Sequence, residues 1–383
     1  MLKIRKSLEN IVRDYKTLTI FKDFIQKFNI LNKTLKETFL FVLLSIVKNM
    51  NTILRSFGLG ITFALAGIAN AQDPELSQYY AAPVYTNPAM AGTAVCDYGA
   101  AGRFSMNYRN QWPNLPGTFR SFAASWDQHI PAVGGGIGAM VFHDIAGTGL
   151  LKSTTISGVY SYLLRLDRRQ RMFMRFGLQG SLVNKSIDWS KLRFSDQIDP
   201  TQGFVNPTGE QPPTLQKTYP NFNAGWIMYT QKFYVGFAAH NITEPGWSFF
   251  ENPDEVQPRR YTVHAGGLIP LSRNRWETNN FSPNMLFMKQ RNFTQLNVGF
   301  YANKGPLVTG LWFRQTFGQK SNPDAVIMLV GFRKNRFKFG YSYDFTVSDG
   351  RTAIPSSHEV SATIDWCVPP GRHPFKPLRC PEF

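Results

Sequence analysis

Aromatic and polar side chains alternate through residues 336–347. The aromatic residues occupy every second position and are Phe337, Phe339, Tyr341, Tyr343 and Phe345. Because successive side chains of a strand point to opposite faces, this pattern predicts a strand with one aromatic face and one charged, polar or small face. A single strand of this kind also suits a soluble β-sandwich. Its repetition along the chain favours a membrane β-barrel with a polar interior and a lipid-facing apolar band.

The alternation recurs in thirteen further segments. These are residues 103–109, 120–128, 134–142, 150–164, 172–182, 218–230, 232–241, 260–271, 281–289, 292–303, 306–316, 325–333 and 356–366. An even strand number is usual for single-chain bacterial barrels. The predicted fold class is therefore all-β, a transmembrane antiparallel β-barrel of about fourteen strands. The small or polar face of each strand, which includes Gly177, Gly340 and Ser342, is assigned to the lumen.

Two long segments interrupt the alternation. Residues 188–217 contain four prolines among Asn, Gly and Thr, which predicts a long loop. Outer-membrane barrels carry their long loops on the extracellular side, so this loop is expected there. Residues 242–257 predict a second loop, and its aromatic residues, including Trp247 and Phe249, are expected to fold back over the barrel mouth.

The first 71 residues resemble segments that precede a mature protein. Residues 1–49 are basic and are expected to be a mis-annotated N-terminal extension before a true start at Met50, with a long cleaved leader as the alternative. Residues 50–71 combine Arg55, an apolar run and a small-residue cleavage site that ends at Ala71. This combination is typical of a secretory signal peptide.

The remaining chain divides into three predicted parts. Residues 72–98 are rich in Pro, Asn and Gly but also carry apolar residues. They are expected to form an irregular N-terminal segment that lies in the barrel mouth or lumen. Residues 99–366 form the predicted outer-membrane β-barrel. Residues 367–383 are rich in Pro and basic residues, and a short C-terminal periplasmic tail is expected for them.

Composition and charge narrow the class further. Charged residues make up 17% of the chain and aromatic residues 14%, whereas soluble proteins usually contain about 25% charged residues. The formal net charge of +17 suits anionic partners, but no basic helix, zinc pattern or RNA-binding signature indicates nucleic acid. The excess positive charge is therefore assigned to a basic lumen or a basic periplasmic face.

Three cysteines are present: Cys96, Cys367 and Cys380. No C-x-x-C spacing indicates a metal site. In an oxidising periplasm Cys367 and Cys380 could form a disulfide. Cys96 is then a free thiol or an alternative partner for one of them.

No catalytic motif stands out, so no catalytic, cofactor-binding or metal-binding residue is predicted and a non-enzymatic protein is expected. Six histidines are scattered without metal-ligand spacing. His358 and Glu359 are neighbours, but they must point to opposite faces of their strand. A porin is the serious alternative, because lumen charges could form a selective ring that residues 188–217 constrict. The candidate charges are Arg103, Arg109, Arg175, Arg314, Lys338 and Asp344; pairing among them along the lumen wall is the preferred interpretation.

Short motifs at both ends of the predicted barrel region resemble one family. The opening motifs are Gln78-Tyr79-Tyr80, Asn87-Pro88-Ala89, Gly92-Thr93, Asn107-Tyr108-Arg109-Asn110-Gln111-Trp112-Pro113 and Trp126-Asp127. The closing motifs are Gly340-Tyr341-Ser342-Tyr343-Asp344-Phe345-Thr346 and Ser357-His358-Glu359-Val360-Ser361. Together they resemble the PorP/SprF family, whose members are outer-membrane proteins of the type IX secretion system in Bacteroidetes. The signature residues taken from this resemblance are Asn87, Pro88, Gly92, Arg109, Trp112, Asp127, Tyr343, Asp344, His358 and Glu359.

The resemblance implies a barrel of the bacterial outer membrane that serves secretion or cell-surface attachment of cargo proteins, gliding adhesins among them. It implies as partners a secreted cargo protein recognised through its C-terminal domain, ring and lipoprotein components of the secretion system, and outer-membrane lipid. An outer-membrane porin or diffusion channel is the alternative. The cargo, the stoichiometry and the contact loop do not follow from the sequence.

The signatures also make physical sense as structural elements. Asn87, Pro88 and Gly92 would fix the irregular segment before the first strand. By alternation, Arg109 and Asp344 both lie on the lumen face, where an unpaired buried charge is costly. They are expected to pair across the lumen or to hold the N-terminal segment in place.

Overall fold

The computed structural model describes residues 73–96, 99–113, 117, 119–147, 151–169, 171–199, 201–209, 214–249, 255–271, 279–317, 322–347 and 356–368. The chain divides into two units, Met1–Ala71 and Gln72–Phe383, and every described residue belongs to the second. The predicted extension, the predicted signal peptide and nearly all of the predicted C-terminal tail therefore lie outside the described residues.

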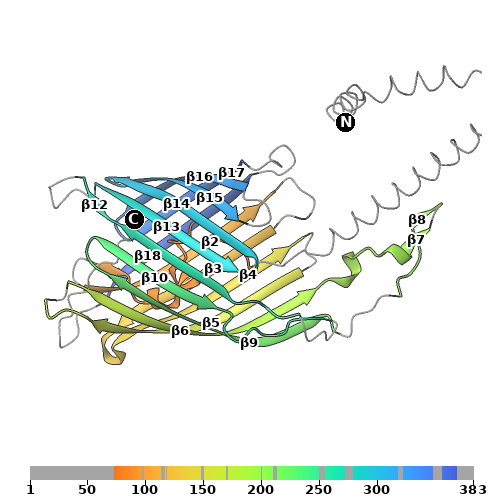
Figure 1. Cartoon of the computed structure of the whole chain (residues 1–383), viewed down its shortest axis with the longest axis horizontal. Helices are drawn as coiled ribbons and strands as arrows, with labels where there is room; N and C mark the ends of the chain where they lie inside the picture. Colours follow the sequence, from red (N-terminus) through yellow and green to blue (C-terminus); the bar gives the residue numbers. More distant parts are fainter. Residues whose placement is uncertain are drawn as a thin grey trace, which may run out of the picture. The chain divides into compact units, whose positions relative to one another are not determined.

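Fourteen antiparallel strands form a closed barrel (Figure 1). They are β2 (Gly99–Gln111), β3 (Phe119–Ile130), β4 (Gly135–Ala146), β5 (Leu151–Arg165), β6 (Phe173–Ile187), β9 (Gln216–Tyr229), β10 (Phe233–His240), β11 (Arg260–Gly267), β13 (Asn280–Gln290), β14 (Phe293–Lys304), β15 (Leu307–Phe317), β16 (Asn322–Lys334), β17 (Phe337–Thr346) and β18 (Ser357–Cys367). Each strand pairs with the next, and β18 pairs with β2 to close the barrel, with Glu359 opposite Arg109. The predicted fold class and strand number are confirmed.

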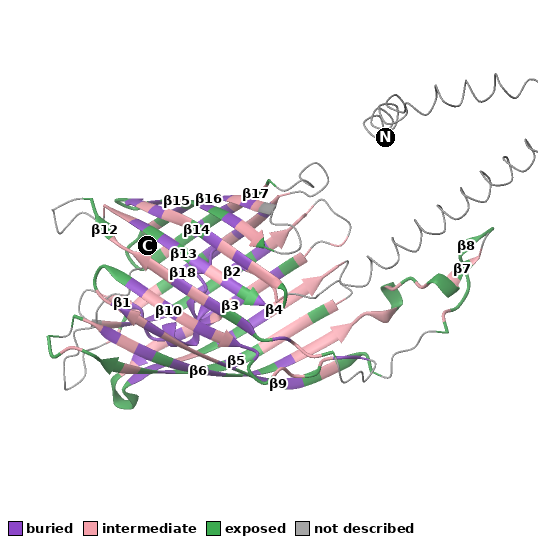
Figure 2. Ribbon diagram, in the orientation of Figure 1, coloured by how far each residue is buried: buried purple, intermediate pink, exposed green. Residues whose placement is uncertain are grey.

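The alternation seen in the sequence becomes an outer apolar face and an inner polar face. In β17, Phe337 is 62% exposed and Phe339 is 53% exposed, whereas Ser342 and Asp344 on the other face are buried. Buried and exposed residues alternate in the same way along the other strands (Figure 2). An exposed apolar outer face is stable only where lipid covers it. No helix among the described residues is long and apolar enough to cross a membrane.

The connections differ between the two ends of the barrel. At one end, which we call the short-turn mouth, brief turns join β5 to β6, β9 to β10, β14 to β15 and β16 to β17. The 3-10 helix η3 (Pro131–Val133) joins β3 to β4 there, and the short strand β12 (Ile269–Pro270) extends the pairing of β13. The other end, the long-loop mouth, carries the connections from β6 to β9 and from β10 to β11. Outer-membrane barrels usually carry their short turns on the periplasmic side, and we expect the same orientation here.

The connection from β6 to β9 forms an arm that extends beyond the barrel (Figure 1). It contains the 3-10 helices η4 (Trp189–Lys191) and η5 (Ser195–Gln197) and the small hairpin of β7 (Ile198–Asp199) and β8 (Gly203–Phe204). Its described residues are half-buried or exposed. The arm therefore lies outside the lumen, and the hypothesis that this segment constricts the barrel is wrong for its described residues.

The connection from β10 to β11 folds back over the long-loop mouth, as predicted. Phe249 is buried, and the ammonium group of Lys185 lies 4.1 Å from the centre of the Trp247 ring. Lys217 also donates a hydrogen bond to the carbonyl oxygen of Ser248 at 3.1 Å. Contacts with β6 and β9 thus hold the described part of this loop on the barrel.

The N-terminal segment lies inside the lumen, one of its two predicted locations. We call residues 73–94 the plug. The plug is not wholly irregular, because it contains a one-turn helix α4 (Pro83–Thr86) and a 3-10 helix η2 (Pro88–Met90), each with proline at its start. The short strand β1 (Val95–Cys96) then pairs with the beginning of β2. The plug residues Val84, Asn87 and Ala89 are completely buried.

The predicted disulfide between Cys367 and Cys380 is wrong in this structure. Cys367 is bonded to Cys96, with their Cα atoms 5.6 Å apart. Cys96 ends β1 and Cys367 ends β18, and both strands lie beside the start of β2. Barrel closure therefore brings the two cysteines together despite their separation of 271 residues.

Candidate functional site

The plug starts at the long-loop mouth. Asp73 forms an ion pair with Arg260 at 3.6 Å and accepts a hydrogen bond from the side chain of Asn241 at 2.9 Å. The side chain of Gln257, in the loop that covers this mouth, donates to the other carboxylate oxygen of Asp73. The backbone N–H of Asp73 donates to Gln290 at 3.1 Å. All four partners belong to strand ends or loops at this mouth, so the plug begins here and descends toward the short-turn mouth.

A network of buried charges holds the next part of the plug. The Asp344 carboxylate lies 3.0 Å from Arg109 and 3.1 Å from Arg314, and all three side chains are nearly completely buried. The hydroxyl of Ser77 donates to Asp344 at 2.6 Å and accepts from both guanidinium groups. The predicted pairing of Arg109 with Asp344 is thus confirmed. Because Ser77 belongs to the plug, the pair also ties the N-terminal segment to the wall.

Glu359 on β18 binds the plug through the backbone. One carboxylate oxygen accepts from the N–H of Ser77 at 2.6 Å, and the other accepts from the N–H of Gln78 at 3.1 Å. Arg109 lies 3.4 Å from the same carboxylate. His358 lies on the outer face, where its ring is 2.8 Å from the Tyr341 hydroxyl. The sequence prediction that His358 and Glu359 cannot share one site is confirmed.

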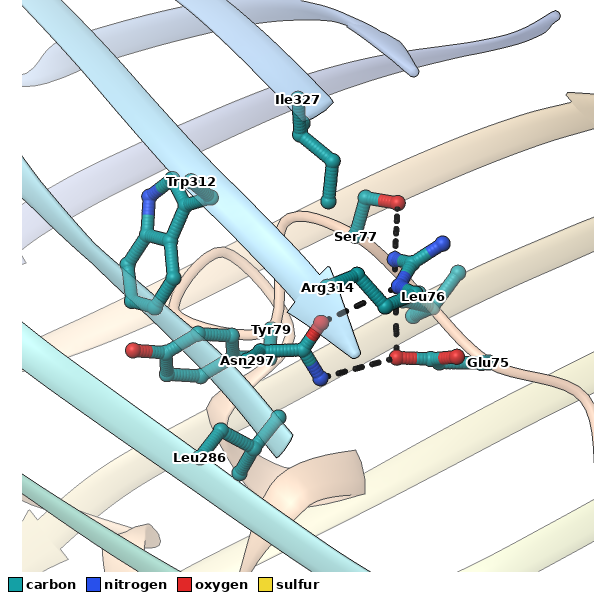
Figure 3. A pocket seen from close by; sticks show the side chains of 9 residues that line it. All are labelled: Glu75, Leu76, Ser77, Tyr79, Leu286, Asn297, Trp312, Arg314 and Ile327. Carbon is teal, nitrogen blue, oxygen red and sulfur yellow. Dashed lines mark hydrogen bonds and ion pairs between the residues drawn. The ribbon is translucent and has the colours of Figure 1, made fainter. Parts of the chain in front are cut away.

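Glu75 enters the network from the other side of Arg314 (Figure 3). The two side chains are 3.5 Å apart, and Asn297 donates to Glu75 at 3.3 Å. A small pocket separates this part of the plug from the wall. Residues of both components line it, as Figure 3 shows: Glu75, Leu76, Ser77, Tyr79, Leu286, Asn297, Trp312, Arg314 and Ile327. Polar and apolar contacts therefore both join the plug to the barrel here.

Asn87 anchors the middle of the plug. Its amide nitrogen lies 3.1 Å from the carbonyl oxygen of Trp226, 3.2 Å from that of Phe237 and 2.9 Å from the His264 ring nitrogen. Its amide oxygen accepts from the N–H of Ala89 and so caps the helix η2. A buried side-chain amide with both ends bonded fixes one position of the segment.

The close approach of the plug explains a glycine on the wall. At Gly177 in β6, an added Cβ atom would overlap the backbone of Pro88 and Ala89. The apolar side chains around this contact, Met90 with Phe173, Ile227 and Tyr229, form one buried cluster. The plug therefore packs against the wall backbone itself.

Another buried ion pair holds the part of the plug that is nearest to the short-turn mouth. Arg103 contacts both carboxylate oxygens of Asp127, at 2.9 and 3.0 Å, and both side chains are buried. Asp127 also accepts from the N–H of Gly92 at 2.7 Å. Gly92 has a φ angle of +70°, which favours glycine. Nearby, Arg175 donates to the carbonyl oxygen of Ala91 at 3.0 Å.

The structure brings seven of the ten signature residues together in or around the plug, with Pro88 starting η2. They are Asn87, Pro88, Gly92, Arg109, Asp127, Asp344 and Glu359. The other three lie elsewhere. Trp112 packs edge-on against Phe119 at the long-loop mouth. Tyr343 and His358 contact each other on the outer face.

Sequence reasoning missed several residues that bind the plug. The acidic residues Asp73 and Glu75 and the polar Ser77 lie in a segment without periodicity, so the sequence does not reveal what they face. Arg260 and Asn297 occupy inner positions of their strands and could have been identified from alternation as candidate partners. Among the described residues, no group of His, Cys, Asp or Glu side chains could hold a metal ion. The arrangement is suited to fixing a segment and filling the lumen.

Comparisons with known proteins identify the family of the chain. Residues 68–364 match the family described as type IX secretion system membrane protein PorP/SprF. No curated protein sequence gives a significant match. Among solved structures, the toluene transporter TbuX of Ralstonia pickettii is 11% identical, with 74% of this chain and 92% of that chain covered and a TM-score of 0.43.

A second similar structure is the KdgM porin. It is 9% identical, with 69% of this chain and 99% of that chain covered and a TM-score of 0.31. The family match spans most of the chain, including the whole plug and all but the last residues of the barrel. The chain thus belongs to the PorP/SprF family of type IX secretion system membrane proteins and is a protein of the bacterial outer membrane.

Proposed function

We propose that this protein is a non-enzymatic barrel that acts in secretion or cell-surface attachment of cargo proteins, gliding adhesins among them. In this proposal it binds a cargo C-terminal domain, periplasmic ring or lipoprotein components, or both. The observation that carries the proposal is the plug, because its buried contacts fill the space a diffusing solute would need. A filled barrel is suited to presenting surfaces to protein partners.

The free-energy cost of breaking the buried plug contacts supports a permanently filled lumen. Arg109, Asp344 and Glu359 are buried, and moving the plug out would remove hydrogen bonds from all three. Removal of the whole plug would expose several such groups at once. Small-solute diffusion is therefore the less favoured function.

The arm at the long-loop mouth is the surface we assign to cargo. Ile198, Phe204 and Val205 are each about half exposed, at 49%, 51% and 54%. Ile198 and Phe204 pair in the hairpin β7–β8, and Val205 follows it, in the arm that extends beyond the barrel (Figure 1). Neighbouring exposed apolar side chains in such a position are typical of protein contact sites.

The test is recovery of partners from native outer membranes. The tagged chain is extracted in mild detergent and its partners are identified by mass spectrometry. The proposal predicts a large secreted protein bound through its C-terminal domain, or periplasmic ring components. Phe204→Ser with Val205→Ser should abolish cargo recovery, whereas the outer-face double variant Val298→Ser with Thr309→Ser should retain it. Recovery of the barrel alone after cross-linking would contradict the proposal.

A diffusion channel is the alternative function, and conductance separates the two. The purified protein is inserted into a planar lipid bilayer at neutral pH. The plugged barrel should show no steady single-channel current. A stable open conductance in the unaltered protein would favour the channel.

A further inference from the structure

The two mouths of the barrel differ in the charge of their connecting segments. At the short-turn mouth, the described connections carry five basic residues and one acidic residue: Arg168, Arg169, Arg171, Lys232, Arg336 and Asp167. At the long-loop mouth, they carry four basic and five acidic residues: Lys191, Arg193, Arg259, Arg291, Asp188, Asp196, Asp199, Glu244 and Glu255. Among the described connecting segments, the excess positive charge therefore lies at the short-turn mouth.

The basic residues of this mouth form two groups. In the first group, the turn with Arg168, Arg169 and Arg171 is adjacent to the turn with Lys232, because β6 pairs with β9. All four side chains are exposed. Among the described residues, no ion pair involves any of them. Four exposed positive charges on two neighbouring turns attract an anion from outside the chain.

The second group lies on another part of the rim. Lys304 ends β14 and Lys334 ends β16, and Arg336 lies in the next turn. The pairing of β15 with β16 places these turns side by side. Alternation directs both lysines outward, on the same face as Phe332, which is 50% exposed. Aromatic residues followed by lysine are typical of the boundary between lipid tails and headgroups, where the long side chain reaches the headgroup.

We propose that the short-turn mouth binds the phosphate groups of anionic phospholipids in the leaflet around it. Both basic groups border the lipid-facing band, and they are separated along the rim by β10, β11 and β13. A ring of headgroups contacts both groups at once, whereas a compact acidic protein surface contacts one. This binding is independent of the proposed cargo role.

The test compares two matched pairs of outward lysines at opposite ends of the barrel. The full chain is purified in detergent and titrated with phosphatidylglycerol or phosphatidylcholine, and bound lipids are counted by native mass spectrometry. Lys304→Gln with Lys334→Gln should weaken phosphatidylglycerol binding about fivefold for each charge removed. Lys152→Gln with Lys289→Gln, at the strand ends of the long-loop mouth, should leave it unchanged. Phosphatidylcholine binding should be weaker and unaffected by either pair.

Two further probes separate the possible sources of negative charge. Millimolar inorganic phosphate should not displace the lipid, and polyglutamate should compete poorly. Displacement by phosphate would assign the surface to free phosphate, and stronger binding of polyglutamate would assign it to an acidic protein; either result would overturn the proposal. An equal loss of phosphatidylglycerol binding in the two double variants would also overturn the proposal, since the difference in charge between the mouths would then have no effect.

Discussion

The hydroxyl of Ser77 donates a hydrogen bond to the carboxylate of Asp344 at 2.6 Å, although 267 residues separate them. Ser77 belongs to the plug and Asp344 to β17. The same carboxylate lies within 3.1 Å of two arginines from other strands. One carboxylate therefore joins the N-terminal segment to both its own strand and two others, and its loss should affect plug and barrel together.

Asp344→Asn should lower the free energy of unfolding by about 3–5 kcal/mol. The buried guanidinium groups of Arg109 and Arg314 would then lose the carboxylate that neutralises them. Denaturant unfolding in detergent micelles, followed by the shift in gel mobility, measures this. His358→Gln, on the outer face, should change it little. Unaltered stability of Asp344→Asn with selective loss of cargo would show that this residue serves partner recognition.

Gly177→Ala should loosen the plug, because the added methyl group overlaps the backbone of Pro88 and Ala89. We expect lower thermal stability and intermittent currents in a planar bilayer. Gly158→Ala is the matched control, since its strand β5 is adjacent and no atom lies within 4 Å of an added Cβ. If the Gly177→Ala protein carries no current and is as thermally stable as the Gly158→Ala control, the wall backbone must shift to accept the methyl group.

Cys96→Ser should destabilise the folded protein by about 2–5 kcal/mol, because a long chain loop loses its closure. Cys367→Ser should have the same effect, and the double variant should be no worse than either single one. Cys380→Ser is the control and should be neutral. Peptide mapping without reductant should recover a fragment that joins Cys96 to Cys367; a fragment that joins Cys367 to Cys380 would contradict the structure.

Acid should loosen the arm. Hydrogen bonds to Asp196 from the backbone N–H of Gly209 and from Thr208 lower the pKa of this exposed carboxyl below its usual value. A lowered carboxyl pKa stabilises the folded form above the unfolded pKa, and this stabilisation is lost as the pH falls through the folded pKa. The protection factor of the Gly209 amide in hydrogen exchange, which is corrected for the intrinsic pH dependence of exchange, should therefore fall below about pH 4, the usual range of aspartate. Asp196→Asn should lower this protection factor already at neutral pH and remove its change with pH.

The wall of the barrel is largely predictable from sequence. Lipid requires an apolar outer face and the plug a polar inner one, so strands such as β17 show their period of two directly. All fourteen predicted strands are present, although β6 continues to Ile187, five residues beyond its predicted end. The extra residues lack apolar outward side chains, because this part of the strand projects toward the arm and no longer needs to contact lipid.

The plug contacts could not be predicted in the same way. Asn87 binds His264, which is 177 residues away, and no local pattern records such a pairing. The disulfide is different, because the positions of the cysteines in the sequence do indicate the pairing. Cys96 precedes the first strand and Cys367 ends the last, and antiparallel closure of an even-stranded barrel places both at one rim. The expected pairing of Cys367 with Cys380 did not take this closure into account, whereas the alternative that Cys96 pairs with one of the other two cysteines agrees with the structure.

The path of the plug has a consequence for the seam where the first and last strands of the barrel meet. The plug continues through β1 into β2, while Ser77 and Gln78 bond to Glu359 in β18. One segment thus contacts both strands of this seam. Loss of the plug contacts should therefore weaken the closure of the cylinder as well as the filling of its lumen.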